Sequence, residues 1–309
     1  MTRKRPRTRR PERSSVPAHE GLCSELSHVV ARWLASDAGK SIVGTIASWY
    51  EGDRADKFGR DHTFLEFLLP LVQFLYHQYF RVEATGVGHV PVDGPAILVA
   101  NHAGALPYDG AMVGLAVFNN HTKKRDVRFL VDDFVFDLPL LGTFIQRIGG
   151  VRASQENAQA LIDAGHLIAV FPEGTKGIGK LYDERYQLQR FGKGGFVRLA
   201  MRTQAPIVPV AIVGSEEIHP IIWKSDKFAK PLRLPFLPFT PTFPWLGPLG
   251  LVPLPSKWKI TFARPVKFDR FTEKDAENEE LVNEKADEIK AAIQEMLDKT
   301  LAERKSIWI

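Results

Sequence analysis

Two short segments of this chain carry side chains suited to one kind of reaction. Residues 101–110 follow an apolar run and include His102 and, seven positions later, Asp109. Residues 170–176 also follow an apolar run and include Glu173, a glycine and a hydroxyl. A hydroxyl attacks well only when a base removes its proton, and a histidine oriented by a carboxylate can be that base. The two segments therefore suggest acyl transfer to a hydroxyl.

In this interpretation His102 acts directly on a bound acceptor, without a covalent intermediate on the protein. No Gly-x-Ser-x-Gly motif occurs, and Cys23 is far away in the sequence. The alternative is structural, because Asp109 at the start of a helix and a histidine in the core would give the same pattern. The remaining features of the chain have to decide between the two.

Apolar, β-rich runs alternate with helical stretches from about residue 81 onward. Strands are expected at 81–86, 96–100, 126–131, 166–171, 207–213 and 257–263, and helices at 109–118, 138–147, 155–164 and 193–203. This alternation predicts an α/β fold with a mixed, mostly parallel sheet flanked by helices. Ligands in such sheets bind beyond the carboxyl ends of strands, where both segments are expected.

Composition divides the chain into four parts. Residues 1–20 are expected to form a basic disordered tail, 21–80 a helical membrane-docking region, 81–270 the α/β domain and 271–309 a C-terminal helix. One face of that helix is expected to pack on the domain through Val282, Ala286, Ile289, Ile293 and Met296.

The basic character of the protein comes from its tail. The whole chain has a net charge of +5, and residues 1–13 contribute +6 through seven basic side chains and one acidic one. Such a tail could bind an anionic membrane surface, at about 1 kcal/mol per basic residue. It could also bind nucleic acid or be a solvated end, and we expect no specific nucleic-acid partner.

Two apolar segments favour contact with a membrane surface. Residues 63–80 are rich in Phe, Tyr and Leu but include Pro70 and polar side chains, which favours a helix lying in the interface over a membrane span. Residues 231–255 are rich in proline, and Arg233 is their only charged residue. This segment could contact the membrane or cover an acyl chain. For both segments the alternative is packing against the core.

Other sequence features exclude several classes of site. The single cysteine excludes an intramolecular disulfide, which fits a reducing compartment. The histidines show no metal-ligand spacing, so no metal or other cofactor is expected. No apolar run reaches the ~18 residues of a transmembrane helix. We therefore expect a peripheral or monotopic protein on the cytoplasmic face of a membrane.

The motifs, taken in order, resemble the glycerolipid acyltransferase superfamily. They are Asn101-His102 with a spaced Asp109, then Phe-Pro-Glu-Gly-Thr at 171–175 and Val-Pro-Val at 208–210. The best-known members acylate 1-acylglycerol-3-phosphate with an acyl thioester. The resemblance covers about residues 82–215. It implies acyl-CoA or acyl carrier protein as co-substrate, a glycerolipid acceptor such as a lysophospholipid, and membrane lipids as partners.

The resemblance also implies roles for individual residues. His102 matches the catalytic histidine of the family and Asp109 its partner. Glu173, Gly174 and Thr175 match the acceptor-binding loop, and Lys176 follows them. Arg147 matches the phosphate-linked arginine of the middle motif, with Arg152 as the nearby substitute, and Lys193 lies in a Phe-Lys-Gly element. The resemblance implies that all seven of these residues bind substrate.

Two departures from the family pattern bear on the acceptor. Six residues separate His102 from Asp109, which is more than usual, and Pro107 stands where the aspartate is expected. This form resembles the branch nearer the monoacylglycerol and diacylglycerol acyltransferases. Lys176 replaces the usual arginine and lacks its bidentate fork. The acceptor therefore stays open between phosphorylated and neutral glycerolipids.

Three other functions compete with acyl transfer. One is a lipid-binding or interaction protein without turnover, which the altered His–Asp spacing would suit. Another is a polyanion-binding protein that acts through the tail. A nucleotide-binding loop is suggested by the glycine pattern from Gly174 to Gly179 and Lys180. It is disfavoured because Leu181 follows, where Mg²⁺ binding needs Ser or Thr.

Overall fold

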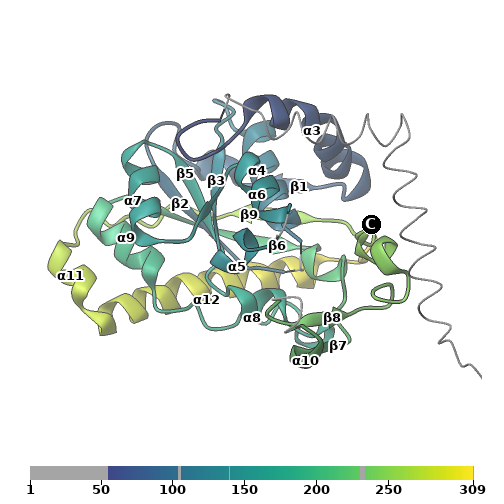
Figure 1. Ribbon diagram of the computed structural model, residues 1–309. Helices are drawn as coiled ribbons and strands as arrows, with labels where there is room; N and C mark the ends of the chain where they lie inside the picture. Colours follow the sequence, from purple (N-terminus) through teal and green to yellow (C-terminus); the bar gives the residue numbers. More distant parts are fainter. Residues whose placement is uncertain (1–54, 104–105, 139, 230–233, 309) are drawn as a thin grey trace, which may run out of the picture. The chain divides into compact units, whose positions relative to one another are not determined.

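The computed structural model describes residues 55–103, 106–138, 140–229 and 234–308, and its centre is a β-sheet with helices on both faces (Figure 1). Within the described residues this sheet has seven strands, in the order β1-β9-β6-β2-β5-β3-β4. Their bounds are β1 (Glu83–Thr85), β2 (Ala96–Ala100), β3 (Val127–Val131), β4 (Gly150–Arg152), β5 (Leu167–Val170), β6 (Ile207–Val213) and β9 (Lys259–Phe262).

Within the described residues, helices and smaller elements lie before, between and after these strands. The α-helices are α3 (His62–Phe74), α4 (Tyr108–Asn120), α5 (Asp133–Phe136), α6 (Leu141–Arg147), α7 (Gln155–Asp163), α8 (Thr175–Ile178), α9 (Gly195–Thr203), α10 (Asp226–Ala229), α11 (Glu273–Glu277) and α12 (Glu279–Glu303). A π-helical turn, Leu75–Tyr79, continues α3, and 3₁₀ turns cover Val87–His89, Tyr182–Glu184, Ser215–Glu217 and Gly247–Leu251. A separate antiparallel pair consists of β7 (Trp223–Ser225) and β8 (Leu237–Phe239).

The sheet confirms the predicted mixed, mostly parallel arrangement. β2 lies between β5 and β6 and pairs in parallel with both, while β9 runs antiparallel to β6. The register aligns Val99 with Val170, and Ala100 with Val210. As a result, the segments that follow β2 and β5 leave the sheet side by side at its carboxyl edge. These are the two segments singled out in the sequence.

Alternation along each strand divides the core into two layers. In β2, Ile97 and Val99 pack with α7, α9 and α12, while Leu98 and Ala100 pack on the opposite face with α4. Both faces are covered, which explains why β2, β5 and β6 are apolar throughout rather than alternating with polar residues.

The C-terminal helix packs largely as expected. In α12, Val282, Ala286, Ile289 and Ile293 are buried in the core. Met296, expected to complete the stripe, is only half-buried, and Leu297 is fully buried.

The remaining differences from the predicted elements are local. The edge strand β4 was not predicted because it is short and begins with glycine. The expected helix at 138–147 begins only at Leu141, after the separate short helix α5. Pro70 lies inside α3 without ending it. No helix within the described residues is long and apolar enough to cross a bilayer. The basic tail expected at 1–20, and residues 21–54 of the expected helical region, lie outside the described residues.

Candidate active site

The loop that carries His102 starts with an amide side chain that extends the sheet. Asn101 follows β2 and is completely buried. Its Nδ2 donates to the Ile212 carbonyl at 2.9 Å, and its Oδ1 accepts the Ile212 N–H at 2.7 Å. The side chain thus supplies Ile212 with the two hydrogen bonds that a longer β2 would supply from its main chain. This fixes the main chain immediately before His102.

The predicted pair of His102 and Asp109 meets in the structure. His102 Nδ1 lies 3.0 Å from Asp109 Oδ2, and the same oxygen accepts the Ala103 N–H at 2.7 Å. Asp109 lies in the first turn of α4 and is fully buried, while the His102 side chain is 22% exposed. The loop of six intervening residues folds back, so the longer spacing does not separate the two side chains. With a proton on Nδ1 directed to the carboxylate, Nε2 is the ring nitrogen left to act as a base.

Packing holds the imidazole in this orientation. The ring of Phe171, the first residue after β5, lies against it with a centroid separation of 4.6 Å and an interplanar angle of 31°. An aromatic face on the imidazole and a carboxylate on Nδ1 together restrict both side-chain torsions of His102.

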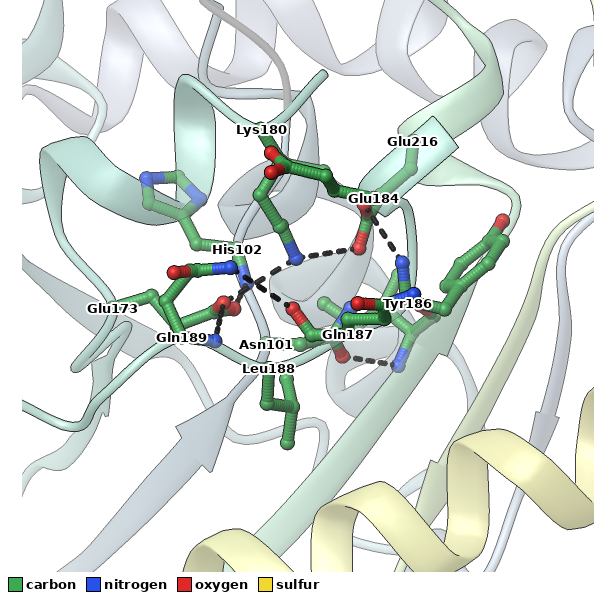
Figure 2. Close-up of polar contacts among 12 residues, drawn as sticks. Asn101, His102, Glu173, Lys180, Glu184, Tyr186, Gln187, Leu188, Gln189 and Glu216 are labelled. Carbon is green, nitrogen blue, oxygen red and sulfur yellow. Dashed lines mark hydrogen bonds and ion pairs between the residues drawn. The ribbon is translucent and has the colours of Figure 1, made fainter. Parts of the chain in front are cut away.

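Glu173 binds the main chain of His102, and its side chain does not face solvent. Its side chain is fully buried. Oε1 accepts the His102 main-chain N–H at 2.9 Å, and Oε2 accepts the Gln189 N–H at 2.8 Å (Figure 2). The family resemblance implies a role for Glu173 in acceptor binding. In this structure both of its oxygens are already bound to main-chain donors.

The glycines after Glu173 allow the turn and its close approach to the histidine. Gly174 has φ 55° and ψ −141°, a conformation essentially restricted to glycine. A Cβ on Gly177 would lie 2.6 Å from the Glu173 Cβ and 3.1 Å from the His102 Cβ. Gly177 therefore lets α8 lie directly against the His102 loop. Thr175 is half-buried in the first position of α8, and Lys176 is exposed.

The arginines implied to bind phosphate are engaged elsewhere. Arg147 Nε binds Asp61 Oδ2 at 3.1 Å, and its guanidinium lies over the Phe64 ring. Arg152 is exposed and binds Asp133 at 3.0 Å. Lys193 is exposed in the turn before α9. The structure therefore brings His102, Asp109, Glu173 and Gly174 together, whereas Arg147 and Arg152 pair with carboxylates outside this group.

An apolar cavity of about 380 Å³ borders the histidine. Its wall includes Phe129 of β3, Ile145 of α6 and Ala111 of α4, together with His102. Residues of the proline-rich segment complete it, namely Leu234, Pro235, Phe236, Leu237, Pro238, Phe243 and Leu251. The volume lies within the range of about 300–1,000 Å³ typical of small-molecule sites. An apolar chain lying in this cavity would have one end next to the imidazole.

Sequence reasoning missed two buried residues behind this site. Lys180 Nζ lies 2.8 Å from Glu216 Oε1 and 3.3 Å from Glu173 Oε2, so one ammonium lies between two carboxylates (Figure 2). Burial raises the pKa of Glu216 to about 7, although the neighbouring Lys180 acts in the opposite direction. In the sequence Lys180 looked only like part of a nucleotide loop, and Glu216 had no motif. Among the described residues, no group of three or more His, Cys, Asp or Glu side chains is arranged to hold a metal ion.

Comparisons with known proteins agree with the fold and with the class of enzyme. Residues 81–213 match the family model described as Acyltransferase. An uncharacterised protein of Mycobacterium tuberculosis is 42% identical over 302 residues, which cover 97% of this chain and 82% of the relative. The "DGAT1/2-independent enzyme synthesizing storage lipids" of Bos taurus is 28% identical over 199 residues, covering 60% of this chain and 55% of that enzyme.

A solved acyltransferase structure has a similar fold. The 1-acyl-sn-glycerophosphate (LPA) acyltransferase PlsC from Thermotoga maritima aligns with a TM-score of 0.51 and 17% sequence identity, covering 93% of this chain and 98% of that one. Together with the family match, this defines an acyltransferase fold. The chain belongs to the glycerolipid acyltransferase superfamily.

Proposed function

We propose that this acyltransferase moves a fatty acyl group from acyl-CoA or acyl carrier protein to a hydroxyl of a glycerolipid, such as a lysophospholipid. The observation that carries this proposal is a histidine bound to a buried carboxylate at the edge of an apolar cavity. An acyl chain in the cavity would bring its thioester carbonyl close to His102. The imidazole could then reach both the carbonyl and an acceptor hydroxyl.

The residues present can account for each proton transfer in the reaction. Nε2 of neutral His102 takes the proton of the acceptor hydroxyl as the oxygen attacks the thioester carbonyl. The fully buried Asp109 stabilises the imidazolium that forms. When the carbon–sulfur bond breaks, His102 returns the proton to the departing thiolate. The products are an ester and a free thiol, and no residue is acylated.

The acceptor is proposed at the level of a glycerolipid hydroxyl, with or without a phosphate. Arg147 and Arg152 are bound to carboxylates, which disfavours a site built around them for phosphate. Lys176 and Lys193 are exposed and could bind an acceptor phosphate. The printed name of the Bos taurus relative refers to storage lipids, which supports including neutral acceptors.

We further propose that the protein binds the cytoplasmic face of a membrane peripherally or monotopically. Helix α3 exposes Phe67, Leu71 and Phe74. The segment after β8 exposes Trp245 and Leu249, at 73% and 72%. Large apolar side chains in solvent are typical of interfacial contact.

A contact joins these two apolar regions. The Tyr79 hydroxyl, just after α3, donates to the Pro253 carbonyl at 2.6 Å. The segment that exposes Trp245 also walls the cavity through Phe243 and Leu251. A lipid leaving the bilayer at this segment would therefore enter next to the cavity.

The decisive experiment is an acyl-transfer assay with the purified protein. Radiolabelled acyl-CoA and acyl carrier protein are offered with a panel of lysophospholipids, monoacylglycerol and diacylglycerol. We expect transfer to at least one acceptor, and a kcat on the order of 10³-fold lower for His102→Ala. Near wild-type transfer by a folded His102→Ala variant would refute the role of His102. Lipid binding without transfer from either donor would instead favour a non-catalytic protein.

A further inference from the structure

The buried cluster of Glu173, Lys180 and Glu216 lies behind the His102 loop, outside the cavity. The three side chains are 0%, 3% and 4% exposed. None of them lines the apolar cavity. In Figure 2 the imidazole of His102 points away from the Lys180 ammonium, so the cluster faces the main chain of the loop and not the reacting ring.

The cluster connects three separate parts of the chain. Lys180 binds Glu173, which follows β5, and Glu216, which follows β6. The Glu216 Oε2 also accepts the Tyr186 N–H at 3.0 Å. Glu173 in turn holds the N–H groups of His102 and Gln189. A displacement of the Lys180 ammonium is therefore transmitted to His102 through one carboxylate.

The electrostatics make the position of Lys180 critical. Above about pH 7, where Glu216 is mainly ionised, two carboxylates and one ammonium are buried together, which leaves one negative charge uncompensated within the cluster. Removing Lys180 would leave Glu173 and Glu216 to repel each other, so one of them would move or take up a proton. A protonated oxygen of Glu173 could no longer accept both the His102 N–H and the Gln189 N–H.

Such a cluster is a costly way to gain stability. Moving charges out of water costs as much as a buried ion pair usually returns, and well-packed apolar residues often stabilise a core better. Geometry is what the cluster supplies here. With Asn101 bound to β6 and the Ala103 N–H bound to Asp109, the Glu173 contact completes a set of hydrogen bonds that restrains three consecutive residues.

We infer that Lys180 and Glu216 are positioning residues for acyl transfer, holding Glu173 where it fixes the main chain of His102. This inference rests on the proposed function. Neither residue touches the substrate. Their effect is to keep the imidazole at the correct distance from the acceptor hydroxyl.

The test compares Lys180→Met and Glu216→Gln with the wild-type protein. We expect kcat to fall by on the order of 10- to 100-fold, with KM nearly unchanged, because a displaced base slows the chemical step without altering the cavity. The double variant should recover part of the kcat lost in Lys180→Met, since it removes one buried charge of each sign. Amide hydrogen exchange of the segment containing His102 should become faster in both single variants.

Glu217→Gln is the matched control. Glu217 is the next residue, is also buried, and pairs with Arg304 Nη1 at 2.6 Å. No described hydrogen bond or ion pair joins it to Glu173 or His102. This variant should lose stability but keep both the wild-type kcat and the exchange of the His102 segment.

The outcomes separate this inference from the proposed function. Glu216→Gln keeps the size of the side chain, so it remains informative if Lys180→Met does not fold. If both variants match Glu217→Gln in kcat and in exchange, the positioning role is wrong, even when His102→Ala abolishes transfer. If the wild-type protein transfers no acyl group, the proposed function fails. In that case faster amide exchange of the His102 segment only in Lys180→Met and Glu216→Gln would still support the inference that these residues fix the main chain of His102. Unchanged exchange in both variants would overturn that inference.

Discussion

Replacing Gly177 with alanine should impair catalysis through a single added methyl group. The new Cβ would lie 2.6 Å from the Glu173 Cβ, 3.1 Å from the His102 Cβ and 3.2 Å from the His102 carbonyl oxygen. Carbon atoms in contact prefer about 3.5–4.0 Å. Because Glu173 and α8 are joined by the short turn at Gly174, the methyl group has to displace the supports of His102 by about 1 Å.

The expected magnitudes follow from that displacement. A misplacement of about 1 Å in a catalytic group costs on the order of 10²-fold in rate, or about 2.7 kcal/mol of transition-state stabilisation. Overpacking of this kind also destabilises the fold by about 1–3 kcal/mol. Helix propensity works in the opposite direction, since alanine is favoured over glycine by about 1 kcal/mol. We expect the steric term to win, because the closest contact is far below van der Waals distance.

Gly88→Ala is the control for this substitution. Gly88 lies in the 3₁₀ turn Val87–His89, and a Cβ there would meet nothing within 4 Å. Steady-state acyl transfer and thermal unfolding of both variants are measured together. We expect about 100-fold lower kcat and a lower Tm for Gly177→Ala, with Gly88→Ala close to wild type. Equal kcat and Tm for the two variants would show that α8 does not restrain His102.

Three further predictions address stability, the cavity and the membrane. The pKa of Glu216, raised to about 7 by burial from its ordinary 4.5, means that the folded state binds a proton more tightly than the unfolded state. The free energy of unfolding should then fall by about 3 kcal/mol as pH rises from 4.5 to 7. Urea titrations at several pH values should show that the free energy of unfolding of Glu216→Gln depends less on pH than that of the wild type. An equal pH dependence of the two proteins would contradict this. Ala111→Phe fills part of the cavity, so kcat/KM should fall more for long than for short acyl-CoA donors, and a uniform loss would argue against an acyl chain there. The double variant Trp245→Ala, Leu249→Ala should reduce the fraction of protein that floats with liposomes at least about 10-fold. Val92→Ala, which also changes an exposed apolar residue, should not reduce it. Equal flotation of all variants would show that Trp245 and Leu249 do not contact the membrane.

Local sequence signals predicted most of the α/β scaffold. Runs such as Ala96–Ala100 and Ile207–Val213 are apolar, bounded by turns and separated by helical patterns, and each signal lies within a few neighbouring residues. The Phe-Pro-Glu-Gly-Thr and Asn-His motifs are equally local, so the amino-acid sequence is enough to recognise the superfamily. The edge strand Gly150–Arg152 escaped detection because three residues carry too little pattern.

The meeting of His102 and Asp109 needed both levels. The sequence placed one residue after a strand and the other at the start of a helix. Only the folded loop shows that six intervening residues still allow a 3.0 Å contact. Similarly, the proline-rich segment is apolar by composition, but its contribution to the cavity wall depends on where it packs.

Contacts between distant parts of the chain were decided by the tertiary structure alone. Asn101 binds Ile212, Arg147 binds Asp61, and Lys180 binds Glu216 across 111, 86 and 36 residues. Such pairs leave no periodic trace in the sequence, because strand order and loop packing determine which side chains meet. By itself the sequence determined the type of sheet, the superfamily and the histidine that we propose as the base. The folded chain determined what holds that histidine in place: hydrogen bonds and close packing at His102 exist only when β2, β5 and β6 lie side by side.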